Sequence, residues 1–93
     1  MDINDWRRQI DEIDDQLLEL FNRRAACSIE IGALKHQMNL CVCSLEREAE
    51  VIGRALRSNR GPLDEEAIRR LFEAILEESR RLQVRAAEQE TGR

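Results

Sequence analysis

Apolar residues recur every three or four positions through the first third of the chain. The series runs Ile3, Trp6, Ile10, Ile13, Leu17, Leu20, Arg24, Cys27, Ile31, Leu34 and Met38, and Arg24 is its one charged member. This spacing places all of them on one face of an α-helix, as in the seam of a coiled coil. The pattern predicts a helix over about residues 4–38, with Asp2 or Asn4 as its N-cap.

Two shorter helices are predicted to follow. Turn-forming residues cluster at 39–44 and 58–64 and divide the chain into three segments. The second segment, about 45–58, follows Ser44, which can serve as an N-cap. The third begins at about residue 64, ends at 83 or a little beyond, and carries an apolar stripe of Ile68, Leu71, Phe72, Ile75, Leu76 and Leu82. We expect a single all-α domain over residues 1–93 (one long helix and two shorter ones), with a frayed tail over about 85–93.

The first helix is too long for the fold that one such chain builds. Thirty-five helical residues extend about 52 Å, whereas a compact domain of 100 residues has a radius of gyration of about 13 Å. A chain of 93 residues also has a thin core of its own. The apolar seam therefore needs a partner, and we expect the three helices to be intertwined with those of a second copy as a homodimer.

Composition narrows the classes of function. The net charge of −4 argues against a nucleic-acid partner bound through its phosphates. No apolar run approaches the roughly 20 residues that span a bilayer, so no membrane association is expected. The acidic N-terminus lacks the apolar stretch of a signal peptide. Three cysteines cannot all pair within one chain, which favours a reducing, cytoplasmic location.

Metal and nucleophile chemistry have weak support in the sequence. Cys27, His36, Cys41 and Cys43 do not follow a usual zinc-ligand spacing, so no metal site is predicted. The chain also lacks a glycine-rich phosphate loop and any local arrangement typical of a hydrolase triad.

Polar residues on the apolar stripes are more informative. Arg24 lies on the first seam, and Lys35, the only lysine of the chain, follows 11 residues later in nearly the same direction and about 16 Å along the axis. Ser79 and Gln83 similarly interrupt the stripe of the third helix. An anionic ligand would compensate two inward cations. Alternatively, both cations extend to solvent or pair with acids of other helices, and Ser79 and Gln83 are satisfied core groups.

Arg7 lies 17 residues before Arg24, about 25 Å away along the same helix. Two side chains of one chain cannot contact a small ligand across that distance. In an antiparallel dimer, however, Arg7 of one chain could approach Arg24 of the other.

Short motifs in a fixed order cover about residues 3–84. They are Arg7-x-x-Ile10-Asp11-x-Ile13-Asp14-x-x-Leu17-Leu18-x-Leu20, Arg23-Arg24, Ile31-Gly32-x-x-Lys35, Glu46-Arg47-Glu48-Ala49-Glu50-Val51, Asn59-x-Gly61-Pro62-Leu63 and Ile75-x-x-Glu78-Ser79-x-x-x-Gln83. In order and spacing the chain resembles the all-helical (AroQ-class) chorismate mutases. The resemblance implies an intertwined dimer of three-helix chains, without a cofactor, that converts chorismate to prephenate in phenylalanine and tyrosine biosynthesis.

The resemblance also implies roles for individual residues. Arg24 and the partner's Arg7 would bind the two carboxylates of chorismate, while Lys35 and Gln83 would hydrogen-bond its ether oxygen. Glu48 would accept a hydrogen bond from the ring hydroxyl. Arg47 and Ser79 would complete the pocket by contacts to the substrate or its neighbours.

Two positions depart from the family pattern. Many members have an aspartate before the second helix, close to the substrate hydroxyl, where this chain has Ser44, which can cap and hydrogen-bond but carries no charge. Gln83 is neutral where some relatives carry glutamate, so we expect activity without an acidic optimum.

Two other functions fit parts of the pattern. One is an isochorismate pyruvate lyase on the same scaffold, although Glu46-Arg47-Glu48 and the Ser79/Gln83 pair favour the mutase. The other is a non-catalytic helical dimerisation module, which explains the seam but not the polar residues on the inward stripes.

Overall fold

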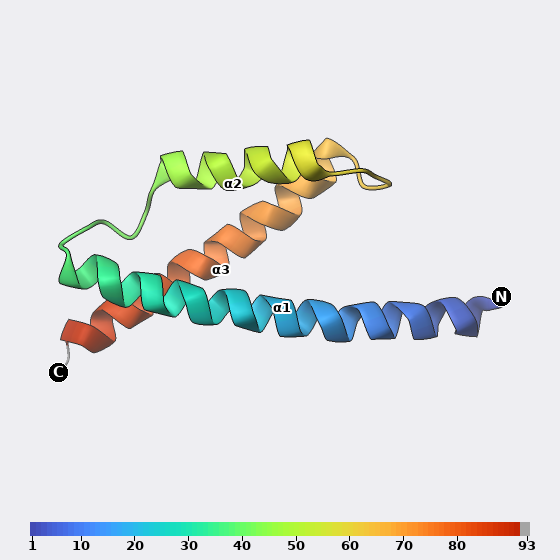
Figure 1. The fold of residues 1–93 in the computed structure, drawn as a ribbon, viewed down its shortest axis with the longest axis horizontal. Helices are drawn as coiled ribbons and strands as arrows, with labels where there is room; N and C mark the ends of the chain where they lie inside the picture. Colours follow the sequence, from blue (N-terminus) through green and yellow to red (C-terminus); the bar gives the residue numbers. More distant parts are fainter. Residues whose placement is uncertain (92–93) are drawn as a thin grey trace.

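Three helices make up the computed structural model, which describes residues 1–91 (Figure 1). They are α1 (Ile3–Gln37), α2 (Leu45–Ser58) and α3 (Glu65–Thr91), and the described residues contain no strand. The all-α prediction is confirmed, with α1 and α2 beginning and ending within a residue of the expected positions. None of the three helices is long and apolar enough to cross a membrane.

Local hydrogen bonds explain where α1 and α2 begin. The Asp2 carboxylate accepts from the backbone N–H of Asp5 at 2.9 Å, and Asp5 accepts from the N–H of Asp2 at 2.9 Å, which forms a capping box. Ser44 Oγ accepts from the N–H of Arg47 at 3.2 Å. Ser44 is therefore the N-cap that the sequence predicted, and of the two candidates for α1, Asp2 and Asn4, the N-cap is Asp2.

The end of α1 is fixed by Asn39, whose φ of 58° lies in the left-handed region. The Leu40 N–H donates to the Lys35 carbonyl at 2.8 Å, and the Asn39 N–H donates to the His36 carbonyl at 3.2 Å. This is the Schellman arrangement, in which asparagine tolerates the left-handed conformation. The chain therefore turns at Asn39, two residues after the end of α1 and four residues after Lys35.

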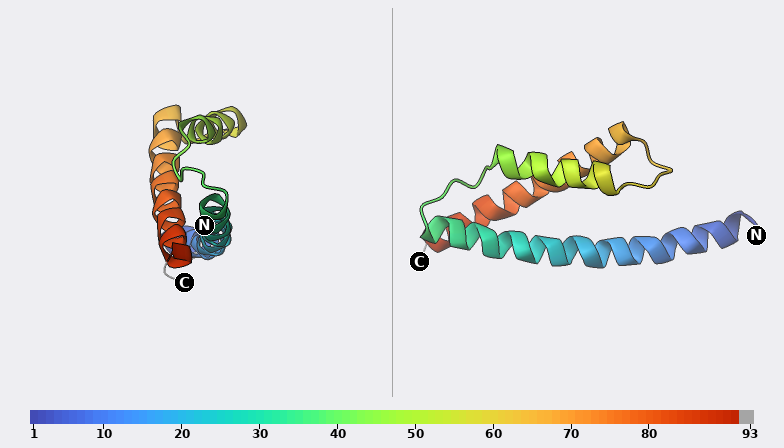
Figure 2. Two further views of the ribbon diagram at one scale, coloured as in Figure 1. Left: turned by 90° about the vertical axis from the view of Figure 1, so that its left-hand side faces the viewer. Right: turned by 45° about the horizontal axis from the view of Figure 1, so that its top comes forward.

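α3 is the shared packing partner of the other two helices. It contacts both α1 and α2, which lie on the same side of α3 and do not pack on each other within the described residues (Figure 2). Its inward stripe buries Ile68, Leu76 and Ser79. Leu71, which the periodicity assigned to the same stripe, is 52% exposed and lies off the buried face.

The prediction for the end of the chain is wrong over residues 85–91. The tail expected to fray is helical there, and α3 continues to Thr91. Ala86 is 5% exposed, and the last turns of α3 lie beside the C-terminal end of α1 (Figure 1). Packing against α1 therefore stabilises turns that local sequence alone would not. Residues 92–93 lie outside the described residues.

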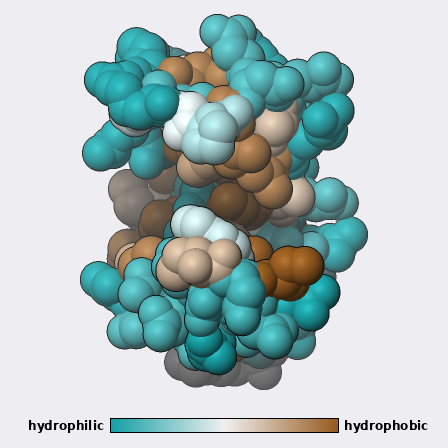
Figure 3. Space-filling view, turned by 90° about the vertical axis from the view of Figure 1, so that its right-hand side faces the viewer, coloured by the Kyte–Doolittle hydropathy of each residue, from teal (hydrophilic) through white to brown (hydrophobic). Residues whose placement is uncertain are grey.

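The first half of α1 extends beyond the other helices. The chain measures 55 × 27 × 15 Å, and α1 runs along most of the longest dimension (Figure 1). Trp6, Ile10 and Ile13 remain 54%, 55% and 53% exposed. Viewed from the N-terminal side, apolar side chains line the hollow between the upper and lower parts of the molecule, whereas the edges of this view are mostly hydrophilic (Figure 3). The apolar seam is thus left uncovered by its own chain.

Candidate active site

A cavity of about 390 Å³ lies where all three helices and the α1–α2 loop meet, a volume typical of small-molecule sites. Seven of the eight predicted site residues line it: Arg24, Lys35, Ser44, Arg47, Glu48, Ser79 and Gln83. Residues from 24 to 83 therefore come together only through the tertiary fold. The eighth, Arg7, is exposed near the start of α1 and does not line this cavity.

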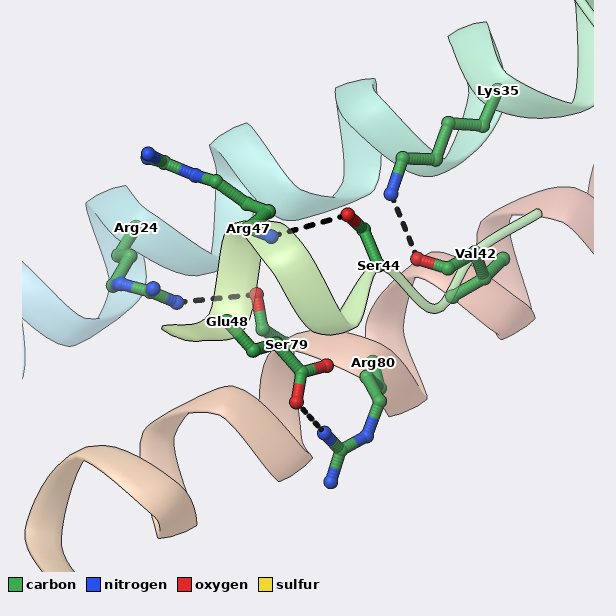
Figure 4. A network of polar contacts seen from close by, with 8 residues as sticks. All are labelled: Arg24, Lys35, Val42, Ser44, Arg47, Glu48, Ser79 and Arg80. Carbon is green, nitrogen blue, oxygen red and sulfur yellow. Dashed lines mark hydrogen bonds and ion pairs between the residues drawn. The ribbon is translucent and has the colours of Figure 1, made fainter. Parts of the chain in front are cut away.

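Arg24 and two serines join α1 to α3 at one end of the cavity. Arg24 Nη1 donates to Ser79 Oγ at 3.1 Å (Figure 4), and the Ser79 and Ser28 hydroxyls share a hydrogen bond. Ser28 and Ser79 are 4% and 9% exposed. Both buried hydroxyls are therefore satisfied, as buried polar groups require, and they fix the Arg24 guanidinium through one of its nitrogens while the rest of the fork stays available to a ligand.

Lys35 is held at the other end by two neutral oxygen atoms. Its Nζ donates to the Val42 carbonyl at 2.7 Å (Figure 4) and to Gln83 Oε1 at 3.1 Å. An ammonium has three donor hydrogens, so one remains. Because the Gln83 oxygen accepts from Lys35, the amide NH₂ faces another direction and can donate to a ligand.

The position of Gln83 depends on a glycine in α1. A Cβ at Gly32 would lie 2.6 Å from both the Cα and the carbonyl oxygen of Gln83, closer than real Cβ contacts. Gly32 is buried where α1 and α3 meet. Its missing side chain allows α3 to approach α1 closely enough for Gln83 to contact Lys35.

Glu48 of α2 forms an ion pair that the sequence did not predict. Arg80 Nη1 on α3 donates to Glu48 Oε1 at 2.6 Å (Figure 4), and the side chains are 38% and 20% exposed. This hydrogen bond raises the pKa of the Arg80 guanidinium above its already high ordinary value. The one signal available in the sequence was that Arg80 directly follows Ser79, since nothing local links positions 48 and 80.

Ser44 and Arg47 contribute differently to the opening turn of α2. Ser44 lines the cavity and caps the helix through its hydroxyl. The Arg47 guanidinium is paired with Glu50 at 3.3 Å, and its side chain is 68% exposed. Of the predicted site residues of α2, Arg47 is thus the one most open to solvent.

Among the residues that the structure describes, metal ligands do not gather around the cavity. Within the part of the chain that the structure describes, no group of three or more His, Cys, Asp or Glu side chains could hold a metal ion. Cys27, Cys41 and Cys43 are free, exposed thiols, and Cys27 lines the cavity wall.

The charges around the cavity favour an anion. Arg24, Lys35, Arg47 and Arg80 line it together with a single carboxylate, that of Glu48, among the described residues. This local excess of positive charge stands out in a chain whose net charge is −4. Planar guanidinium groups bind carboxylates through two parallel hydrogen bonds, and an ammonium supplies a compact point charge. The arrangement suits a small molecule with more than one carboxylate.

An all-α chain with a cation-lined cavity between its helices has the features of a protein that binds a small organic anion. The model of the family described as chorismate mutase type II matches residues 6–84. This match covers most of the 93 residues, and the chain belongs to that family.

Several relatives share this region. The chain is 33% identical over 79 residues to a bifunctional chorismate mutase/prephenate dehydratase of Aquifex aeolicus, covering 81% of this chain and 22% of that protein. It is 37% identical over 75 residues to the corresponding bifunctional enzyme of Pseudomonas aeruginosa, covering 75% and 20%. A third such enzyme, from Neisseria gonorrhoeae, is 40% identical over 72 residues, covering 77% and 19%. The chain spans about a fifth of the length of these relatives.

Proposed function

We propose that residues 1–93 act as one chorismate mutase domain that converts chorismate to prephenate, a step of phenylalanine and tyrosine biosynthesis. The observation that carries this proposal is the pairing of Lys35 with Gln83 at 3.1 Å beside a cavity lined by arginines, in a chain of the type II family. The reaction is an intramolecular rearrangement that breaks a C–O bond and forms a C–C bond without a covalent enzyme intermediate. It therefore needs positioned charges rather than a nucleophile.

Lys35 and Gln83 supply the electrostatic part of the proposed mechanism. Negative charge grows on the ether oxygen of chorismate as the C–O bond breaks. The remaining ammonium hydrogen of Lys35 and the amide NH₂ of Gln83 are held before the ligand arrives, by Val42 and by each other. Donors that are already oriented stabilise the transition state more than the ground state.

The arginines supply the conformational part. Chorismate reacts from a compact conformer in which the two ends of the new C–C bond lie close together, and holding that conformer is an orientation effect. Arg24 is fixed through Ser79 and would bind one carboxylate. Arg47 on α2 and Ser44, its N-cap, line the same cavity and would complete the enclosure, with Glu48 accepting from the ring hydroxyl.

We further propose a homodimer in which the partner's Arg7 binds the second carboxylate. The exposed seam of Trp6, Ile10 and Ile13 supports this dimer, because apolar surface of that extent is rare on a monomer. Arg7 lies on the same half of α1, outside the cavity of its own chain. A second copy that covers the seam in the antiparallel direction would carry its Arg7 toward the first copy's cavity.

The direct test of the activity is to incubate the purified chain with chorismate and identify the product. We expect chorismate to disappear and prephenate to form. Pyruvate release from isochorismate without prephenate would instead assign the lyase, and neither reaction, with no binding of a bicyclic transition-state mimic, would refute a catalytic function.

A complementation experiment tests the shared site. Arg7→Ala and Lys35→Ala chains should each be nearly inactive alone. When the two are unfolded and refolded together, random pairing yields heterodimers that hold one intact site, which should restore about a quarter of the wild-type activity. No recovery, although mixed dimers form, would contradict the contribution of Arg7 to the partner's cavity.

A further inference from the structure

Arg80 lines the cavity but has no part in the mechanism proposed above. It stands on α3 directly after Ser79, and its Nη1 donates to Glu48 Oε1 at 2.6 Å (Figure 4). Glu48 belongs to α2, so this ion pair ties the cavity's carboxylate to the helix that carries Ser79 and Gln83. We propose that Arg80 is a positioning residue that holds Glu48 in the orientation in which it accepts a hydroxyl of the bound ligand.

Arg80 can have this positioning effect because a glutamate side chain is flexible. A free glutamate side chain populates several rotamers, and fixing it during binding costs conformational entropy. The Glu48 side chain is 20% exposed and the Arg80 side chain 38%, so their pair is less screened than one on an open surface. Arg80 fixes the carboxylate before a ligand arrives, which moves that entropy cost from binding to folding.

The two oxygens of Glu48 then have separate partners. Oε1 accepts from Arg80, which leaves Oε2 for the ligand. An ionised carboxylate accepts and does not donate, so the position selects a ligand group that carries a hydrogen, such as a hydroxyl. The inference rests on the proposed function, since the ring hydroxyl of chorismate is the group that Glu48 would contact.

Arg81 provides a matched comparison on the same helix. It pairs with Glu77 at 3.1 Å and Glu78 at 3.0 Å, four and three residues earlier in α3, and its side chain is 64% exposed. Such pairs within one helix contribute little to stability. Arg80 instead reaches across to another helix and lines the cavity, which Arg81 does not.

A double-mutant cycle tests the proposal. Arg80→Met removes the donor but keeps an extended apolar stem, Glu48→Gln removes the charge of the acceptor, and Arg81→Met is the control. We expect Arg80→Met to lower kcat/KM for chorismate about tenfold in the wild-type background and less than about twofold in the Glu48→Gln background. It should also weaken binding of a hydroxyl-bearing bicyclic mimic more than binding of its deoxy counterpart, whereas Arg81→Met should change neither.

Any other result of the double-mutant cycle would overturn the inference. An equal loss in both backgrounds would mean that Arg80 acts independently of Glu48, and no loss in either would mean that the ion pair is dispensable. If Glu48→Gln is too slow to assay, the same cycle is measured from the affinity for the hydroxyl-bearing mimic. A wild-type chain that neither converts chorismate nor binds the mimic would refute the proposed function, and with it the inference.

Discussion

The two halves of α1 carry the same apolar spacing but meet different surroundings. In the first half, Trp6, Ile10 and Ile13 are more than half exposed, and the helix extends beyond the rest of the chain (Figure 1). In the second half, Ser28 and Gly32 are buried where α3 lies against the helix. Ile31 and Leu34, which continue the apolar series in this half, are still 44% and 53% exposed, so α3 covers the flank of the seam and not the seam itself.

The halves also differ in the chemistry of their stripes. The first half is apolar throughout, whereas the second is interrupted by Arg24 and Lys35. Both interruptions face α3, and both side chains form hydrogen bonds with polar residues of α3 at the cavity. Within one continuous helix, the first half thus presents an uncovered apolar seam and the second presents polar side chains to the cavity.

Glutamate substitutions on the apolar seam of the first half should give the largest effect, which is loss of the dimer. Burial of an isoleucine side chain contributes about 1.5–3 kcal/mol, so Ile10→Glu with Ile13→Glu removes several such contributions from a dimer. We expect light scattering to show the 10.9 kDa chain in place of a species of twice that mass, with mutase activity lost as well.

Arg8→Glu is the control for this variant. Position 8 lies on the opposite face of α1, and its side chain is 70% exposed. The control should remain dimeric and active. Dissociation caused equally by both variants would show that added negative charge, and not the seam, controls assembly.

Removal of Lys35 in the second half of α1 should lower activity and leave the dimer intact. Lys35→Ala deletes the cation that donates to Val42 and Gln83, and we expect a decrease of about 10²–10³-fold in kcat, as for loss of one transition-state donor. Because Lys35 is not part of the apolar N-terminal seam, sedimentation should show an unchanged dimer. A variant with nearly wild-type kcat would contradict the proposed electrostatic role.

The smallest expected effects are on stability, from replacing either of two glycines by alanine in separate variants. Gly32→Ala would bring a Cβ within 2.6 Å of the Gln83 backbone, so the helices must separate. We expect a loss of about 1–3 kcal/mol in the free energy of unfolding, together with lower activity as Gln83 moves away from Lys35.

Gly53→Ala is the matched change in α2, where the nearest atom is the flexible end of Arg57 at 3.1 Å. Alanine is the better helix former, so this variant should gain about 0.5–1 kcal/mol. Urea titration measures the free energy of unfolding of both variants. A Gly32→Ala chain as stable as the Gly53→Ala chain would contradict the close approach of α1 and α3.

The site itself was only partly predictable from the sequence. Arg24, Lys35, Ser79 and Gln83 could be found because each interrupts an apolar stripe, and the remaining predicted residues came from the family resemblance. Arg80 was missed because it lies beside a stripe and not on it, and its partner Glu48 is 32 residues away. The Val42 carbonyl that holds Lys35 was also missed, since a backbone acceptor has no sequence signature.

The sequence by itself determined the three helices, the N-cap Ser44 and the faces that carry apolar or polar residues, because these follow from spacing and local hydrogen bonding. Tertiary structure decided how far α3 extends, since packing against α1 keeps its last turns helical. It also decided which polar groups meet, because the close approach at Gly32 brings residues more than 45 positions apart into hydrogen-bond distance. Helix periodicity is local, whereas a cavity exists only where separate helices converge.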